Sequence, residues 1–168
     1  MRDKTTIERI SFLHPKLREE ALELYDEIIS SLNGKAICRF SFTFRTFGEQ
    51  DALYAQGRSK PGPIVTKAKG GQSYHNYGLA IDVVLLIDRD KNNIHETASW
   101  DTKPDYDGDG KSDWMEIVAI FKRYGWEWGG DWKFYDAPHF QKTFGKSIME
   151  LHQLHKSGKI DKNGFVLI

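Results

Sequence analysis

Residues 79–87 constrain the fold of this 168-residue chain more than any other segment, because they are apolar throughout except for Asp82. A continuous apolar run of this length predicts a buried β-strand. A carboxylate within such a strand loses its hydration, which is costly unless a metal ion or a cation compensates its charge. The segment therefore predicts a sheet strand that carries one charged side chain together with a partner for that charge.

Other segments predict helices and further strands around this one. Over residues 15–32 apolar side chains recur at helical spacing, and the Asn-Gly pair that follows ends the helix. Residues 37–45 alternate as a strand does, which puts Phe40, Phe42 and Phe44 on one face. The remaining patterns predict helices over residues 48–58, 114–124 and 147–156 and a strand near His139. Helices and strands mixed without regular βαβ units indicate an α+β fold.

The length and composition fit one folded domain. Hydrophobic residues make up 39% of the chain and aromatic residues 13%, which is enough for a packed core. The length leaves little room for a second domain. No internal repeat, low-complexity tract or interdomain linker divides the sequence. We therefore expect a single compact domain over residues 1–168.

Charge and cysteine content narrow the partners and the compartment. Lysine plus arginine equals aspartate plus glutamate at 24 each, which gives no electrostatic reason to expect nucleic acid or a membrane surface as partner. The single cysteine, Cys38, excludes an internal disulfide and favours a cytosolic origin. The first ten residues lack the apolar segment of a signal peptide, and no run is long enough to span a bilayer. We expect a monomer that is synthesised in the cytoplasm and does not insert into a membrane.

Two short segments supply side chains that suit a metal ion. His75 lies seven residues before Asp82, and Gly78 permits the turn or bulge that would bring both side chains to one face. Farther along the chain, Asp136 precedes His139 by three residues. Two imidazoles and one carboxylate leave a fourth tetrahedral position open for water, which is typical of catalytic zinc, and Asp136 would suit a general base near that water. Taken singly, however, such histidines and aspartates are more often structural.

Taken together, the two segments carry a family resemblance. The pattern Ser-x-His-x-x-Gly-x-Ala-x-Asp at residues 73–82 and the pattern Asp-x-Pro-His-Phe at residues 136–140 resemble the zinc D-Ala-D-Ala carboxypeptidase and L-alanyl-D-glutamate endopeptidase family. That family includes phage endolysins and bacterial wall hydrolases, and the likeness extends over about residues 39–144. It implies a small antiparallel sheet flanked by helices, in an α+β fold related to the hedgehog signalling domain.

The resemblance also implies roles for individual residues. His75, Asp82 and His139 would bind zinc, and Asp136 matches the catalytic carboxylate. Aspartate rather than glutamate at this place favours the L-alanyl-D-glutamate endopeptidase branch. Arg45 lies in a segment that looks like the arginine-bearing segment of the family, where a guanidinium could polarise the scissile carbonyl. A structural ion pair is the alternative role for this arginine.

Further side chains are candidates for substrate contact, namely Gln50, Arg58, Ser73 and Trp128. Ser73 could equally be a turn hydroxyl, and Trp128 could equally belong to the core. Glu127 and Asp131 are rivals to Asp136 as the general base, although neither has a fixed spacing to a metal ligand.

Residues 105–116 match the twelve-residue EF-hand loop and predict a calcium site. Its expected ligands are Asp105, Asp107, Asp109, Lys111, Asp113 and Glu116. Gly110 occupies the sixth position, where the chain must turn sharply. Ser112 departs from the aliphatic residue usual at the eighth position, and the preceding segment is a poor entering helix. A solvated acidic loop is the alternative to a calcium ion with a structural or regulatory role.

The function that these features predict is zinc-dependent hydrolysis of peptidoglycan stem peptides. The bond between L-alanine and D-glutamate is the expected target, and the protein would act on the cell wall as an endolysin or wall hydrolase after phage-type release. A D-alanyl-D-alanine carboxypeptidase or dipeptidase is the alternative within the same chemistry. A non-catalytic wall-binding domain of the same fold is a second alternative, against which Asp136 and Arg45 argue.

Overall fold

The apolar segment is the central strand of an antiparallel sheet. The computed structural model describes residues 2–168. Its strands are β1 (Ala36–Phe42), β2 (Ala80–Ile87), β3 (Thr97–Ser99), β4 (Glu127–Trp128) and β5 (His139–Gln141). The order is β1-β2-β5-β4, and β3 pairs with the C-terminal end of β2. All pairings are antiparallel, so β2 touches three of the other strands and carries the sheet.

Alternation along β2 divides its side chains between two environments. One set points into the main hydrophobic core and comprises Ile81, Val83, Leu85 and Ile87. The residues between them belong to the opposite face, because successive side chains of a strand point to opposite sides. Asp82 is one of these, so the carboxylate lies on the face of β2 away from the main core.

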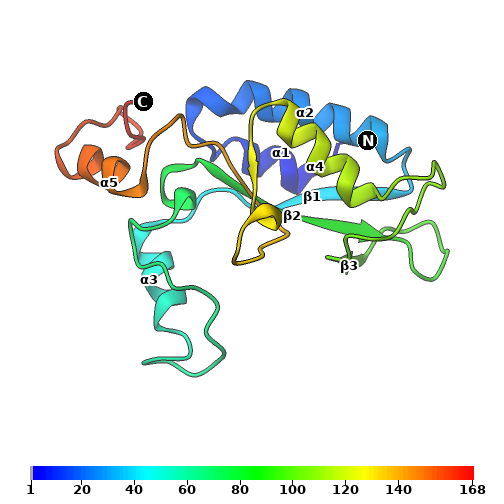
Figure 1. The fold of residues 1–168 in the computed structure, drawn as a ribbon, viewed down its shortest axis with the longest axis horizontal. Helices are drawn as coiled ribbons and strands as arrows, with labels where there is room; N and C mark the ends of the chain where they lie inside the picture. The colour runs from blue at the N-terminus through cyan, green and yellow to red at the C-terminus, as the bar shows by residue number, and fades with distance from the viewer. Residues whose placement is uncertain (1) are drawn as a thin grey trace.

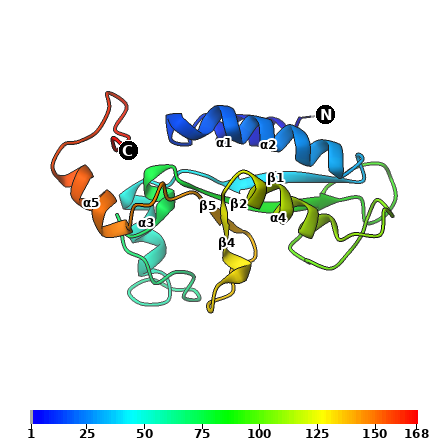
Figure 2. The ribbon, with the colours of Figure 1, turned by 45° about the horizontal axis from the view of Figure 1, so that its top comes forward.

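Three helices cover the core face of the sheet (Figures 1 and 2). They are α1 (Lys4–Ile10), α2 (Arg18–Ser31), which follows the 3₁₀ turn η1 (Pro15–Leu17), and α4 (Asp113–Arg123). The ring of Phe121 in α4 stacks on Phe140 of β5 with centroids 4.0 Å apart. Burying side chains of this size contributes about 1.5–3 kcal/mol each. The packing therefore holds β5 in register beside β2.

Two further helices lie at one end of the sheet. α3 (Phe47–Ala55) and the loop after it extend away from the sheet, and α5 (Ile148–Lys156) lies at the same end (Figures 1 and 2). Capping boxes fix where both helices begin, with Thr46 and Glu49 at α3 and an equivalent pair at α5. Within residues 2–168, no helix has the length and apolar character needed to cross a membrane.

The structure confirms the α+β fold and the helices and strands predicted from the sequence, with small shifts of their ends. One short α-helix and two short strands were not predicted. α1 has seven residues, β3 three and β4 two, so each is too short to give a clear periodic pattern.

The prediction that Phe40, Phe42 and Phe44 share one face is wrong. The register of β1 against β2 shifts between Phe40 and Phe42, which is the mark of a β-bulge. Phe40 is fully buried, whereas Phe42 is 49% exposed. The bulge turns the end of β1 toward the other face of the sheet, where Phe42 pairs with Asp82.

A left-handed glycine joins the 3₁₀ turn η2 (Tyr74–Tyr77) to β2. Gly78 has φ +67°, and its carbonyl accepts a hydrogen bond from the His14 backbone N–H at 2.9 Å. A β-carbon at this position would lie 2.6 Å from the His14 nitrogen. The turn that delivers His75 to the start of β2 therefore requires glycine, both for its φ and for the close approach.

We expect Gly78→Ala to lower the free energy of unfolding by more than the conformational cost alone, which is about 1–2 kcal/mol for a left-handed alanine. Gly34→Ala is the matched control, because Gly34 has φ +70° and a β-carbon there would meet nothing within 4 Å. Urea denaturation of the metal-free proteins measures both costs. Equal destabilisation by the two substitutions would contradict the steric argument at His14.

Candidate metal centre and catalytic cleft

The three predicted metal ligands converge on the face of the sheet away from the main core. Asp82 of β2 and His139 of β5 are direct partners in the antiparallel ladder. His75 comes from η2, and the turn at Gly78 folds it back over the start of β2. Asp82 Oδ1 lies 3.2 Å from His75 Nε2 and 3.1 Å from His139 Nδ1. One ligand atom from each residue lies within 4.8 Å of the others, so the three could hold one ion.

The outer nitrogen of each imidazole is engaged with a hydrogen-bond acceptor. His75 Nδ1 lies 3.1 Å from the Thr43 carbonyl, and His139 Nε2 lies 3.1 Å from Gln141 Oε1. Partners of this kind fix the orientation of a metal-binding imidazole and its tautomer. Both inner nitrogens face Asp82, and each would offer its lone pair to a metal ion bound between them in place of a proton.

Electrostatics keep the central carboxylate ionised. Burial alone would raise the pKa of Asp82, but the charge and hydrogen bonds of His75 and His139 outweigh it and hold the pKa well below its usual range. Burial would lower the pKa of His139, but its hydrogen bond to Asp82 raises it above the ordinary value. An ionised carboxylate beside two imidazoles is a donor set that suits zinc and leaves a fourth position for a substrate or water.

A cleft of about 610 Å³ opens over the three residues and contains Asp136. The tight turn before β5 brings Asp136 near the ligands, since the His139 backbone N–H donates to the Asp136 carbonyl at 3.2 Å. Loss of hydration, and to a smaller extent the charge of Asp82, raises the pKa of Asp136. A carboxyl group with a raised pKa beside a candidate metal centre suits proton transfer.

Arg45 also lines the cleft, and Gln50 holds it there. Arg45 Nη1 donates to Gln50 Oε1 at 2.9 Å, while the Gln50 amide nitrogen donates to the Ala68 carbonyl at 2.9 Å. Arg45 Nε is buried and has no hydrogen-bond partner among residues 2–168. A buried donor without a protein partner is uncommon, and a water molecule or a bound ligand would have to supply its acceptor. Gln50 is fully buried and does not line the cleft, so the prediction of direct substrate contact by Gln50 is wrong.

Arg58 and Trp128 are likewise absent from the cleft wall. The guanidinium of Arg58 donates to the Tyr54 and Thr66 carbonyls, which ties the loop after α3 together. Trp128 is 7% exposed, and its indole N–H donates to the Ala137 carbonyl at 2.8 Å. Burial of this indole places Trp128 beneath the turn that carries Asp136, which agrees with the core alternative for this residue, and substrate contact by Arg58 stays a prediction.

Ser73 does line the cleft, as do residues outside the four candidates for substrate contact. Trp132 is the tryptophan at the cleft, with its ring 5.2 Å from the ring of His139. Asn76 braces the cleft from behind: its amide nitrogen donates to the Arg45 carbonyl, and its oxygen accepts from the Gly71 and Ser73 backbone N–H groups. Asn76 lies one residue after a predicted ligand, and that position was its only sequence signal.

The rival general bases have other partners. Asp131, in the short turn η3 (Gly129–Asp131), pairs with Lys122 Nζ at 2.6 Å. Glu127 Oε2 accepts from the Gln141 amide at 2.9 Å. Neither lines the cleft, so Asp136 remains the candidate for the general base.

The predicted calcium loop gathers its carboxylates into two overlapping groups, which are Asp105, Asp107 and Asp113, and Asp107, Asp109 and Glu116. Asp113 is fully buried, and its Oδ2 has no hydrogen-bond partner among the described residues. The same is true of Glu116 Oε2. Loss of hydration, together with the charge of neighbouring aspartates, raises the pKa of both groups. Gly110 has φ +93°, as the sharp turn at the sixth position requires.

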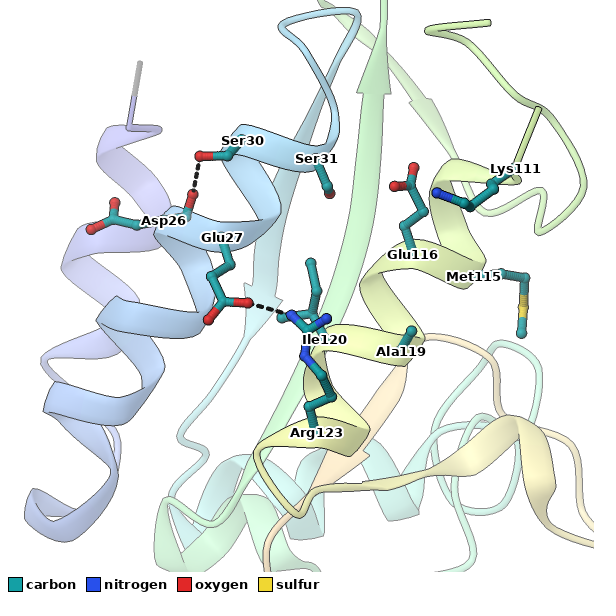
Figure 3. A pocket seen from close by; sticks show the side chains of 10 residues that line it. All are labelled: Asp26, Glu27, Ser30, Ser31, Lys111, Met115, Glu116, Ala119, Ile120 and Arg123. Carbon is teal, nitrogen blue, oxygen red and sulfur yellow. Dashed lines mark hydrogen bonds and ion pairs between the residues drawn. The ribbon is translucent and has the colours of Figure 1, made fainter. Parts of the chain in front are cut away.

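A larger groove, of about 800 Å³, lies between α2 and α4 (Figure 3). Glu27 and Arg123 form an ion pair across it, and Lys111 and Glu116 of the acidic loop border one end. The groove contains none of the three candidate zinc ligands. Volume alone therefore does not identify the candidate site, because the candidate zinc ligands and Asp136 line the smaller cleft.

Comparisons with known proteins agree with this geometry. The peptidase M15 family model described as D-alanyl-D-alanine carboxypeptidase matches residues 66–142, a segment that includes all three candidate ligands and Asp136. The chain is 48% identical over 133 residues to the peptidoglycan L-alanyl-D-glutamate endopeptidase CwlK of Bacillus subtilis, covering 78% of this chain and 74% of that protein. The crystal structure of the L-Ala D-Glu endopeptidase ChiX of Serratia marcescens matches with a TM-score of 0.54 and 23% identity, covering 84% of this chain and 88% of that chain, which supports the fold.

We expect the protein to bind one zinc ion in this cleft. Alanine at His75, Asp82 or His139 removes one of three donors and should abolish stoichiometric zinc, whereas His95→Ala, a histidine outside the cleft, should retain it. Elemental analysis after dialysis gives the zinc content of each variant. Full zinc content in Asp82→Ala would contradict the assignment of the site.

Proposed function

Because the chain belongs to peptidase family M15, we propose that it is an L-alanyl-D-glutamate endopeptidase that hydrolyses stem peptides of bacterial peptidoglycan. Members of this family are hydrolases and are typically zinc-dependent. The observation that carries the proposal is the 48% identity to a peptidoglycan L-alanyl-D-glutamate endopeptidase over most of both chains. The cleft supports it, because the candidate ligands and Asp136 meet there beside Arg45.

In the proposed mechanism His75, Asp82 and His139 would hold the metal. A zinc ion bound there would supply a Lewis acid that polarises a peptide carbonyl and makes a water molecule more acidic. Asp136 takes the proton from the attacking water and then gives it to the nitrogen of the leaving amine. The raised pKa of Asp136 suits both steps, since the group must accept a proton and release it again.

Arg45 stabilises the charge that develops on the carbonyl oxygen. Gln50 occupies only one nitrogen of the guanidinium, and the cleft is open to the arginine. A donor already held in place by Gln50 and Asn76 loses little freedom when the transition state forms. Nothing in this arrangement requires a covalent acyl-enzyme.

We propose in addition that the loop of residues 105–116 binds calcium. The support is the pair of buried carboxylate oxygens, Asp113 Oδ2 and Glu116 Oε2, that have no protein donor although carboxylates surround them. A divalent cation would compensate that charge. The loop leads directly into α4, so calcium would stabilise the start of a helix that packs on the core.

We propose that the protein acts at the cell wall as a monomer. A single chain supplies every side chain of the cleft, so catalysis needs no second copy. Transfer of the protein to the wall by phage-type release belongs to the same proposal. Sedimentation at working concentrations measures the oligomeric state, and a stable dimer would contradict the monomer.

Mass spectrometry of products from defined stem peptides tests the substrate. Cleavage between L-alanine and D-glutamate exposes a D-glutamate amino group, whereas the alternative carboxypeptidase reaction releases the terminal D-alanine. We expect only the first product. Release of D-alanine from a peptide with an intact L-alanyl-D-glutamate bond would replace the proposal by the carboxypeptidase alternative.

Asp136→Asn should bind zinc normally and lose most activity, because the three ligands remain while the base is gone. General-base catalysis typically contributes about 10²–10⁴-fold. Asp131→Asn is the matched control, since this carboxylate pairs with Lys122 outside the cleft, and it should keep its activity. Turnover and zinc content are measured on the same preparations. Normal turnover by Asp136→Asn would remove this residue from the mechanism.

Calcium should raise the melting temperature of the zinc-loaded protein. At a hundredfold excess over the dissociation constant the stabilisation is about 2.7 kcal/mol, or roughly 5–10 °C for a domain of this size. Asp105→Ala combined with Glu116→Ala should abolish this shift. The matched control is Asp88→Ala combined with Asp90→Ala in another exposed acidic loop, which should retain it. No shift in wild type and no heat of binding in calorimetry would rule out the calcium site.

A further inference from the structure

A row of polar side chains crosses the sheet next to the candidate metal centre. Asp82 of β2 is paired with His139 of β5, and two residues later Gln141 of β5 is paired with Glu127 of β4. Side chains two residues apart on a strand share a face, as do direct cross-strand partners. All four side chains therefore stand on the cleft side of the sheet.

The hydrogen bonds along this row permit only one orientation of the amide. Gln141 Nε2 donates to Glu127 Oε2 at 2.9 Å, and Gln141 Oε1 lies 3.1 Å from His139 Nε2. An ionised carboxylate can only accept, so it requires the NH₂ group of Gln141 and turns the amide oxygen toward the histidine. An amide oxygen also only accepts, so His139 Nε2 must carry a hydrogen.

We propose that Gln141 and Glu127 form a positioning pair that keeps a proton on His139 Nε2 and so directs the Nδ1 lone pair at the metal. His139 Nδ1 is the ring atom 3.1 Å from Asp82 Oδ1, on the side where the ligand atoms converge. Neither member of the pair takes part in proton transfer to substrate. The proposal rests on the proposed function, because the metal is the zinc ion assigned there.

Of the two histidines, only His139 depends on other side chains to fix which ring nitrogen carries the hydrogen. His75 Nδ1 lies 3.1 Å from a main-chain carbonyl, that of Thr43, which can only accept. Its orientation is therefore set by the backbone. His139 lies on β5, between the paired strands β2 and β4, and Gln141 on the same strand supplies the acceptor instead.

The pair also gives Glu127 a role. Its carboxylate is engaged with the Gln141 amide rather than directed into the cleft. Glu127 is exposed, whereas Gln141 is 8% exposed, so a change at residue 127 alters the polarity of the pair without disturbing the core.

Zinc affinity, measured by competition with a chelator, tests the proposal. Gln141→Leu removes the acceptor and should weaken zinc binding by about 10- to 100-fold, as loss of such outer partners typically does. Glu127→Gln should weaken it less, because a neutral amide can still accept from Gln141 but no longer forces its orientation. Gln72→Leu is the matched control, because Gln72 lines the cleft without a hydrogen bond to His139. The zinc affinity of this variant should equal that of wild type.

Nitrogen-15 NMR of the zinc-loaded protein identifies which imidazole nitrogen holds the metal. In wild type we expect His139 to retain a slowly exchanging Nε2–H, and in Gln141→Leu that proton should exchange faster. A purely structural role for Gln141 would lower the melting temperature yet leave zinc affinity and this proton unchanged, and that result would overturn the proposal while the proposed function stands. A metal on Nε2 of His139 would overturn the proposal as well. Failure of wild type to bind zinc at all would overturn both.

Discussion

The antiparallel pairing of Asp82 with His139 is the constraint on which the rest of the structure depends. It joins side chains 57 residues apart and sets them on the same face of the sheet. The residues that alternate with them, Ile81 and Phe140, point the other way into the core. A register slip of one residue would exchange the two sets, burying the carboxylate among hydrophobic side chains. Core packing and metal geometry are therefore specified by the same alternation.

On the polar face of the sheet each functional side chain is held by a hydrogen-bond partner, beginning with the Asp82 carboxylate. Asp82 is partly withdrawn from water, and the two imidazoles provide the contacts that keep it ionised. Each imidazole is in turn held from outside, one by the Thr43 carbonyl and the other by Gln141. Arg45 is braced in a similar way by Gln50 and Asn76. A cleft whose groups are held in this way loses little freedom on binding substrate, which is the basis of catalysis by preorganised dipoles.

The sequence alone predicts the parts of this molecule that are local. The apolar strand, the ligand types and the EF-hand-like spacing are read from neighbouring residues, and the Asn-Gly pair at residues 33–34 marks the end of the first long helix. What it misses depends on tertiary contacts. The bulge that exposes Phe42 and the two-residue strand β4 each require the partner strand to be in place. Tertiary contacts also decide that Trp128, for which the sequence leaves core and substrate contact open, is buried. Gln141 is an intermediate case. Its two-residue spacing from His139 can be read from the sequence, but its pairing with Glu127 depends on the contact between β4 and β5.

Anomalous scattering at the zinc edge tests the central claim most directly. Crystals of the zinc-loaded protein should show one strong peak bounded by His75 Nε2, a carboxylate oxygen of Asp82 and His139 Nδ1, at about 2.0–2.2 Å from each atom. Such a peak would establish that the pairing of β2 with β5 builds the metal centre. A principal zinc peak at the acidic loop of residues 105–116, or one bound through His139 Nε2, would contradict this account.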